Sequence, residues 1–309
     1  MRKTSLDTVH ELARRDPRVV FVGSDLGVGT LDAMKREMPE RFFMEGVAEQ
    51  NIIGVAAGLA MEGFIPYVNT IATFLTRRCY EQVAVDLCLH KLPVRLLASG
   101  GGMVYAPLGP THLAVEDMAI MRALPNMTVA AASDAPEMKR LMLQSLDWPG
   151  PMYIRFGKGG DAVISNDQEG YAIGKALLKR APGEVLLIAT GIATTQALKA
   201  AEALEQEGIS CGVLHMHTVK PLDVEALATL LPRVKLAVTV EEHTLMGGLG
   251  SAVLEAVADG GIAAPAIKRL GIPDAFVKDY GSQEHLLASF GLDAAGIAQA
   301  VRSGLEGRR

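Results

Sequence analysis

Short apolar runs alternate with helix-length segments along the chain, and this alternation limits the fold more than any other feature. In the first half, strands are expected at 18–23, 64–68, 94–98, 127–131 and 152–155, and helices at 47–61, 74–90, 115–123 and 135–146. Strands that are separated by helices form parallel sheets covered by helices on both faces. The sequence therefore predicts an α/β protein with a mainly parallel sheet.

The pattern returns after a polar, glycine-bearing stretch. Strands are expected at 185–189, 210–214, 236–240 and 266–270, and helices at 194–206, 224–231 and 250–258, with two more helices at the end. A chain of 309 residues has room for two domains of about 150 residues. We expect two three-layer α/β domains, at 1–160 and 184–309, joined by a linker at 161–183.

Composition excludes several function classes. The net charge of −5 comes without a long basic run, so nucleic-acid binding has no electrostatic support. No apolar run approaches the roughly 20 residues that span a membrane, and the N-terminal residues lack a signal-peptide core. Cys79, Cys88 and Cys211 are odd in number and lack zinc-site spacing. They indicate free thiols in a reducing compartment, and we expect a cytoplasmic protein.

Glu49 is the most informative single residue. It heads a segment that otherwise consists of small and apolar residues, Gly-Val-Ala-Glu-Gln-Asn-Ile-Ile-Gly-Val-Ala-Ala-Gly at 46–58. A buried carboxylate needs a partner, because burying a charge is costly. Glu49 either donates a hydrogen bond as the neutral acid in a functional site, or accepts hydrogen bonds from backbone amides at a helix N-terminus.

Five blocks of sequence resemble the transketolase family, in the order that the family has them. They are Ser-Asp-Leu at 24–26, Gly-Val-Ala-Glu-Gln-Asn at 46–51, Thr-Phe-Leu-Thr-Arg-Arg-Cys-Tyr-Glu-Gln at 73–82, Gly-Pro-Thr-His at 109–112 with Arg-Ala-Leu-Pro-Asn-Met at 122–127, and Glu-Glu-His-Thr-Leu-Met-Gly-Gly-Leu-Gly at 241–250. The chain thus resembles the C-terminal half of a two-subunit transketolase, with a pyrimidine-binding domain and a C-terminal domain.

The resemblance implies thiamine diphosphate as cofactor. Glu49 would hydrogen-bond the N1′ atom of the aminopyrimidine and favour the imino tautomer that activates the cofactor. Phe74 would stack on the pyrimidine, although core packing is the commoner role of a phenylalanine. Asp25, Leu26 and Ile71 would lie near the cofactor, and a turn role for Asp25 stays open.

The resemblance also implies substrate-binding residues. His112 would contact the donor ketose and assist proton transfers. Arg155 would bind a phosphate or sulfonate tail, with an interdomain ion pair as the alternative. Gly100 and Leu108 stand at substrate-binding positions of the family but differ from its usual residues. Gly100 replaces a histidine, and Pro107 and Leu108 together replace an acidic pair. Donor and acceptor therefore differ from the ordinary pentose-phosphate sugars.

The sequence lacks the Gly-Asp-Gly motif through which thiamine enzymes bind Mg²⁺ and diphosphate. Magnesium needs oxygen ligands, so a separate N-terminal-half subunit is expected to supply them, and no metal site is expected in this chain. The small-residue helix at 54–63 would let two subunits approach closely. The resemblance implies a heterotetramer with twofold symmetry.

The expected function is transfer of a two-carbon ketol unit from a ketose, a sugar phosphate or related sugar, to an aldehyde. Three alternatives stay open. They are the beta subunit of a 2-oxo-acid dehydrogenase, a synthase that joins pyruvate to an aldehyde, and a non-catalytic regulatory subunit.

Overall fold

Two sheets organise the chain in the computed structural model, which describes residues 1–24 and 29–306. In spatial order, the strands of the first sheet are β10 (Thr218–Lys220), β5 (Thr128–Ala131), β6 (Met152–Phe156), β4 (Arg95–Ser99), β3 (Ile65–Ile71), β1 (Val19–Gly23) and β2 (Phe42–Met44). Neighbouring strands are parallel except β10, which is antiparallel to β5. The expected, mainly parallel first sheet is confirmed.

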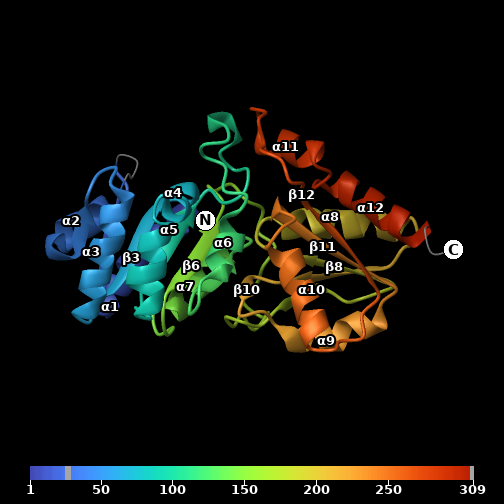
Figure 1. Ribbon diagram of the computed structural model, residues 1–309, viewed down its shortest axis with the longest axis horizontal. Helices are drawn as coiled ribbons and strands as arrows, with labels where there is room; N and C mark the ends of the chain where they lie inside the picture. Colours follow the sequence, from blue (N-terminus) through green and yellow to red (C-terminus); the bar gives the residue numbers. More distant parts are fainter. Residues whose placement is uncertain (25–28, 307–309) are drawn as a thin grey trace.

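Helices cover both faces of this sheet (Figure 1). They are α1 (Arg2–Arg15), α2 (Asp32–Glu37), α3 (Glu49–Met61), α4 (Ala72–Thr76), α5 (Tyr80–Gln82), α6 (Asp117–Ala123) and α7 (Ala135–Ser145), with a π-helix η2 (Val83–Leu89) and 3₁₀ turns η1 (Pro39–Arg41) and η3 (Ala106–Leu108). Leu6, Val9 and Leu12 of α1 pack with α7 on one face. The buried residues of α3, η2 and α6 form the core on the other face.

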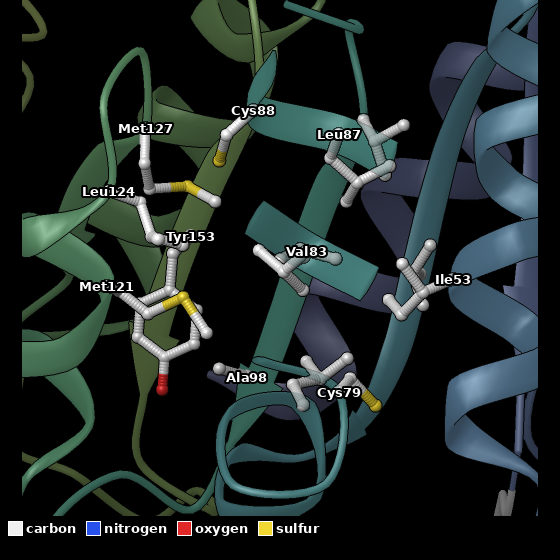
Figure 2. Close-up of a cluster of buried hydrophobic side chains, with 14 of the residues drawn as sticks. Ile53, Cys79, Val83, Leu87, Cys88, Ala98, Met121, Leu124, Met127 and Tyr153 are labelled. Atoms are coloured by element: carbon white, nitrogen blue, oxygen red, sulfur yellow. The ribbon is translucent and has the colours of Figure 1, made fainter. Parts of the chain in front are cut away.

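Figure 2 shows this second core, with Ile53 of α3 on one side and Met121 of α6 on the other side of Val83. Cys79 and Cys88 belong to the same cluster of buried side chains. Burial raises the pKa of Cys79 to about 12 and that of Cys88 to about 11. Both thiols are free, as the sequence predicts, and they contribute to the core as small apolar groups.

The second sheet has the order β12 (Ala266–Ile272), β11 (Leu236–Thr244), β8 (Val185–Ala189), β9 (Cys211–His215) and β7 (Leu177–Arg180). Its strands are parallel except β7, which is antiparallel to β9. The helical elements of this domain are α8 (Ala193–Gln206), α9 (Val224–Leu230), η4 (Leu231–Arg233), α10 (Leu249–Asp259), α11 (Gln283–Ser289) and α12 (Ala294–Glu306). They cover both faces, so this half is also a three-layer α/β domain (Figure 1).

Three sequence expectations need correction. The segment expected as a linker, 161–183, contains strand β7, which belongs to the second sheet. The edge strand β10 comes from the second half of the sequence but pairs with β5 of the first sheet. The helix expected at 74–90 is interrupted between α4 and α5 and continues as the π-helix η2. The two domains are thus joined by the covalent connection between them and by strand β10, which the second half of the sequence contributes to the first sheet.

Apolar side chains also join the domains. Met103, Ala106 and Leu113 of the first domain share a buried cluster with Ile272 and Leu286 of the second. This cluster holds the loop between β4 and α6, which carries the Gly-Pro-Thr-His block, against the C-terminal domain. Within the described residues, no helix has the length and apolar character needed to cross a membrane.

Candidate active site

A pocket with a volume of about 270 Å³ opens at the carboxyl ends of β3 and β4. Its lining residues are Arg2, Val47, Glu49, Asn69, Thr70, Ile71, Phe74, Ser99 and Tyr105. Ligands of parallel α/β sheets bind at the carboxyl edge of the strands, where the loops and helix N-termini converge. Three of the predicted cofactor-binding residues, Glu49, Ile71 and Phe74, therefore lie together at the expected edge.

Glu49 is the first residue of α3, and its side chain is only 4% exposed. Ser24 donates a hydrogen bond to Oε1 over 3.3 Å, and Arg78 donates one to Oε2 over 3.0 Å. Ser24 also lies 2.8 Å from the hydroxyl of Thr70. The described hydrogen bonds to this carboxylate thus come from two side chains. The role of Glu49 towards a cofactor stays a prediction.

Phe74 presents its ring to the same pocket and contacts two further functional groups. The guanidinium carbon of Arg78 lies 3.8 Å from the ring centroid, and the ring of His112 lies edge-on with a centroid distance of 5.3 Å. His112 Nδ1 is 2.9 Å from the hydroxyl of Thr111, which precedes it. The structure thus brings His112 next to Phe74, although the two residues are 38 positions apart in the sequence, and His112 is absent from the pocket lining.

Gly100 supports the wall of the pocket. Its φ of +76° lies in the left-handed region, and a Cβ there would overlap the ring of Tyr105. Tyr105 lines the pocket, and its hydroxyl lies 3.4 Å from that of Ser99. A glycine at this position therefore leaves space that Tyr105 fills. Leu108 is 51% exposed on η3 and is absent from the pocket lining.

Arg155 lies at the junction of the two domains. Its Nε donates to Asp117 over 2.8 Å, and its Nη2 donates to the carbonyl oxygens of Ala114 (3.1 Å) and Glu242 (2.7 Å). Asp117 is fully buried and also accepts a hydrogen bond of 2.7 Å from the hydroxyl of Tyr153. The ion pair with Asp117 lies within the first domain, and the bond to the carbonyl oxygen of Glu242 is the contact by which Arg155 reaches the second domain. Phosphate binding by Arg155 stays a prediction without support from this geometry.

Glu242 completes the junction from the side of the second domain. It accepts a hydrogen bond of 2.5 Å from the backbone N–H of Met103 and two, of 2.9 and 3.0 Å, from the amide of Gln283. Burial raises the pKa of Glu242 to about 7, against the opposing effect of the Arg155 charge. The ionisation of this carboxyl therefore couples pH to the contact between the domains.

Sequence reasoning missed several pocket residues. Asn69 and Thr70 end β3, Ser99 ends β4, and Tyr105 follows the glycine run. The signal that could identify the first three is their position at the ends of neighbouring parallel strands. The predicted residues Asp25 and Leu26 lie outside the described residues.

The described residues contain no clustered metal-binding side chains of the common kinds. Among the residues that the structure describes, no group of three or more histidine, cysteine, aspartate and glutamate side chains is arranged to hold a metal ion. The pocket itself contributes one carboxylate, that of Glu49. The pocket thus combines this one carboxylate with the aromatic rings of Phe74 and Tyr105 and the aliphatic side chains of Val47 and Ile71.

Comparison with known proteins places both domains. Residues 1–160 match the model of the transketolase pyrimidine binding domain, and residues 174–297 match that of the transketolase C-terminal domain. Among curated proteins, the 1-deoxy-D-xylulose-5-phosphate synthase of Synechococcus sp. (strain JA-2-3B'a(2-13)) is 40% identical over 303 residues, which cover 96% of this chain and 46% of that protein. The 1-deoxy-D-xylulose-5-phosphate synthase 1 of Geobacter sulfurreducens is 41% identical over 300 residues, or 96% of this chain and 47% of that protein. The chain spans about half the length of the curated relatives it matches.

Solved structures give the same fold. A structure described as a split gene transketolase, an inactive beta4 tetramer, matches with a TM-score of 0.89 and 35% identity, over 100% of this chain and 98% of that chain. The transketolase of Campylobacter jejuni matches with a TM-score of 0.81 over 98% of this chain and 46% of that chain. Its identity is 18%, so this second likeness concerns the fold alone.

Proposed function

Because the chain belongs to the transketolase family, through its pyrimidine-binding and C-terminal domains, we propose that it is the half of a split enzyme that holds the aminopyrimidine of thiamine diphosphate. Thiamine diphosphate with Mg²⁺ is the cofactor of this family. The observation that carries the proposal is the pocket that Glu49 and Phe74 line together, with the ring of His112 edge-on against the ring of Phe74. Bound there, the cofactor supplies a reactive thiazolium carbon for carbonyl chemistry.

The residues of the pocket fit an aminopyrimidine ring. Such a ring needs a hydrogen-bond partner at its edge and an apolar surface against its face. Glu49 provides a buried carboxylate, and Phe74 and Ile71 provide an aromatic and an aliphatic surface in the same pocket. The guanidinium of Arg78, which is also planar and donates hydrogen bonds, already contacts both Glu49 and Phe74. A flat group with a polar edge therefore suits this place.

Each residue has a distinct role in the proposal. Glu49 holds a proton or hydrogen bond at the ring nitrogen N1′, in a site from which most water is excluded. Phe74 orients the ring by contact with its face. His112 reaches the site from the loop before α6 and holds or moves a proton on the substrate oxygen. Asp25 and Leu26 are proposed, from the family resemblance alone, to lie near the cofactor.

A separate subunit would supply the diphosphate and magnesium site. The sequence lacks the Gly-Asp-Gly motif, and the described residues contain no cluster of metal ligands. The split gene transketolase that matches over almost its whole length is described as an inactive tetramer of beta chains. We therefore propose a twofold heterotetramer in which the complementary half completes each active site.

Two reactions are compatible with this site. The split gene transketolase favours transfer of a two-carbon ketol unit from a ketose to an aldehyde. The curated relatives at about 40% identity are 1-deoxy-D-xylulose-5-phosphate synthases, which favours the second candidate, a synthase that joins pyruvate to an aldehyde phosphate. Leu108 and Pro107 replace the acidic pair expected for a donor hydroxyl, and that loss suits a donor with fewer hydroxyl groups.

The test reconstitutes the chain with a candidate complementary subunit, Mg²⁺ and thiamine diphosphate, and supplies either a ketose phosphate or pyruvate together with an aldose acceptor. Ketol transfer conserves all carbon atoms, whereas condensation of pyruvate releases one CO₂ per product, so CO₂ evolution separates the reactions. Glu49→Gln should remove most turnover with the true donor. Glu62→Gln, at the exposed end of the same helix, is the matched control and should leave turnover unchanged. Turnover that survives Glu49→Gln would refute the proposed site.

A further inference from the structure

We propose that Arg78 competes with the aminopyrimidine for Glu49 and Phe74 in the free chain and must move away before the ring binds. The proposal rests on the function proposed above for the pocket. It adds a conformational step that links occupancy of the cofactor site to the position of one side chain. Three observations carry it: what Arg78 contacts, how lightly it is held, and what its departure leaves behind.

Arg78 contacts the two groups that the pyrimidine is expected to use. Its Nη1 donates to Glu49 Oε2 over 3.0 Å, and its guanidinium lies 3.8 Å from the centroid of the Phe74 ring. A guanidinium is planar, stacks on aromatic faces and presents hydrogen-bond donors at its edge. An aminopyrimidine has the same combination of a flat face and a polar edge. The arginine and the ring therefore compete for the same two side chains, Glu49 and Phe74.

Arg78 is held more lightly than its neighbour. Arg77 donates to Glu116 and to the carbonyl oxygens of Pro110 and Leu113, which fixes its guanidinium against the loop that carries His112. The side chain of Arg78 is 46% exposed, and its polar contact within the described residues is the bond to Glu49. It follows α4 at the point where the helix is interrupted. An exposed arginine on an irregular segment can leave by side-chain rotation alone.

The departure of Arg78 leaves Glu49 in need of a new partner. The carboxylate is 4% exposed, and Ser24, at 3.3 Å, would be its remaining described donor. An unpaired buried carboxylate is unfavourable, so the open state is rare unless a ring that carries a proton on N1′ replaces the guanidinium as the donor. Only molecules in which Arg78 has moved away can bind the ring, so the apparent affinity equals the intrinsic affinity multiplied by the fraction of such molecules. Removing the arginine side chain should therefore strengthen binding.

The experiment is calorimetric titration of the full chain, without any partner, with thiamine diphosphate and Mg²⁺. Because Arg78→Ala abolishes the competing ion pair and cation–π contact, we expect binding about tenfold tighter than in the wild type. Arg78→Gln, which keeps a polar group but cannot reach over the ring, should change affinity in the same direction. Arg14→Ala is the control, because it removes an exposed arginine–glutamate pair at the far end of α1 with the same change of charge.

The outcomes distinguish failure of the proposed competition from failure of the proposed pocket. If Arg78→Ala binds thiamine diphosphate as tightly as the wild type or more weakly, Arg78 does not compete with the ring and is instead a permanent support of Glu49. Absence of binding to every variant also overturns the proposed competition, because removal of the Arg78 side chain should have freed Glu49 and Phe74 for the ring. Adding Phe74→Ala to Arg78→Ala tests the pocket itself. If the double variant loses the affinity gained by Arg78→Ala, the ring binds against Phe74 as proposed. If the affinity is unchanged, the ligand binds elsewhere, and both the pyrimidine pocket and the competition by Arg78 are overturned.

Discussion

Replacing Arg155 should reveal how strongly the ion pair at the domain junction stabilises the fold. Arg155→Met keeps a long side chain but removes the bonds to Asp117 (2.8 Å), Ala114 (3.1 Å) and the Glu242 carbonyl (2.7 Å). Asp117 then stays fully buried with the Tyr153 hydroxyl as its described donor, and its Oδ1 already lacks a partner among the described residues. Removing one partner of a buried pair costs about 3–5 kcal/mol, and we expect the free energy of unfolding to fall by that amount.

The assay is urea denaturation followed by circular dichroism, with an exposed pair as control. Arg180 and Glu205 form a bridge of 2.7 Å, with side chains 33% and 54% exposed, so Arg180→Met should cost at most about 0.5 kcal/mol. Arg155→Met combined with Asp117→Asn should recover part of the loss, because no unpaired charge remains. A loss for Arg155→Met below about 1 kcal/mol, similar to that of the surface control, would refute this account of the junction.

Two further perturbations test the junction and the pocket wall. The folded pKa of Glu242 is about 7, above its unfolded value of about 4.3, so its stabilising neutral form is fully present below about pH 4.3 and lost as pH rises through about 7. Thermal midpoints measured across that range should fall for the wild type relative to Glu242→Gln, and parallel curves would contradict the assignment. Gly100→Ala adds a Cβ at a backbone φ of +76°, and this Cβ overlaps the ring of Tyr105. Gly208→Ala adds a Cβ at a similar φ of +80°, but no other atom lies within 4 Å of it. Gly208→Ala should cost about 1 kcal/mol and Gly100→Ala clearly more, and equal melting temperatures for the two variants would contradict the role of Tyr105.

The strands that form the middle of each sheet could be predicted from the sequence because their neighbours bury them on both faces. The strand predicted at 185–189 is β8, Val185–Ala189, and all five of its residues are buried. The edge strand β12 (Ala266–Ile272) was also predicted, at 266–270, but the edge strands β7 and β10 gave no such signal. β7 (Leu177–Arg180) is buried only at its first residue, and β10 (Thr218–Lys220) is three residues long. Both depend on a partner strand that is distant in sequence, which local pattern does not encode.

The N-terminal helix was missed although its sequence carries a signal. Leu6, Val9, Leu12 and Ala13 are buried on one face of α1, with the spacing of an amphipathic helix. The interruption of the helix expected at 74–90 is different, because residues 77–79 contain neither proline nor glycine. It coincides with the contacts of Arg77 to Glu116 and of Arg78 to Glu49, which are 39 and 29 residues away. Tertiary contacts of this kind override local helix preference.

The candidate site could be predicted in part. Motif resemblance points to Glu49, Phe74 and His112. The structure places Glu49 and Phe74 in one pocket and His112 against the ring of Phe74. The position of Arg78 between Glu49 and Phe74 could not be predicted, because it depends on the relative placement of α3 and α4. Likewise, the sequence could not decide between phosphate and a carboxylate as partner of Arg155, and the geometry of the free chain supports Asp117.

The central claim is that this chain provides the pyrimidine half of a divided thiamine diphosphate site. Calorimetric titration of thiamine diphosphate with Mg²⁺ tests it most directly, with the chain alone, with the chain mixed with a complementary subunit, and with the mixture carrying Glu49→Gln. We predict weak binding to the chain alone, tight binding to the mixture, and a large loss of affinity in the Glu49→Gln mixture. Tight binding to the chain alone, or binding to the mixture that Glu49→Gln leaves unchanged, would contradict the claim.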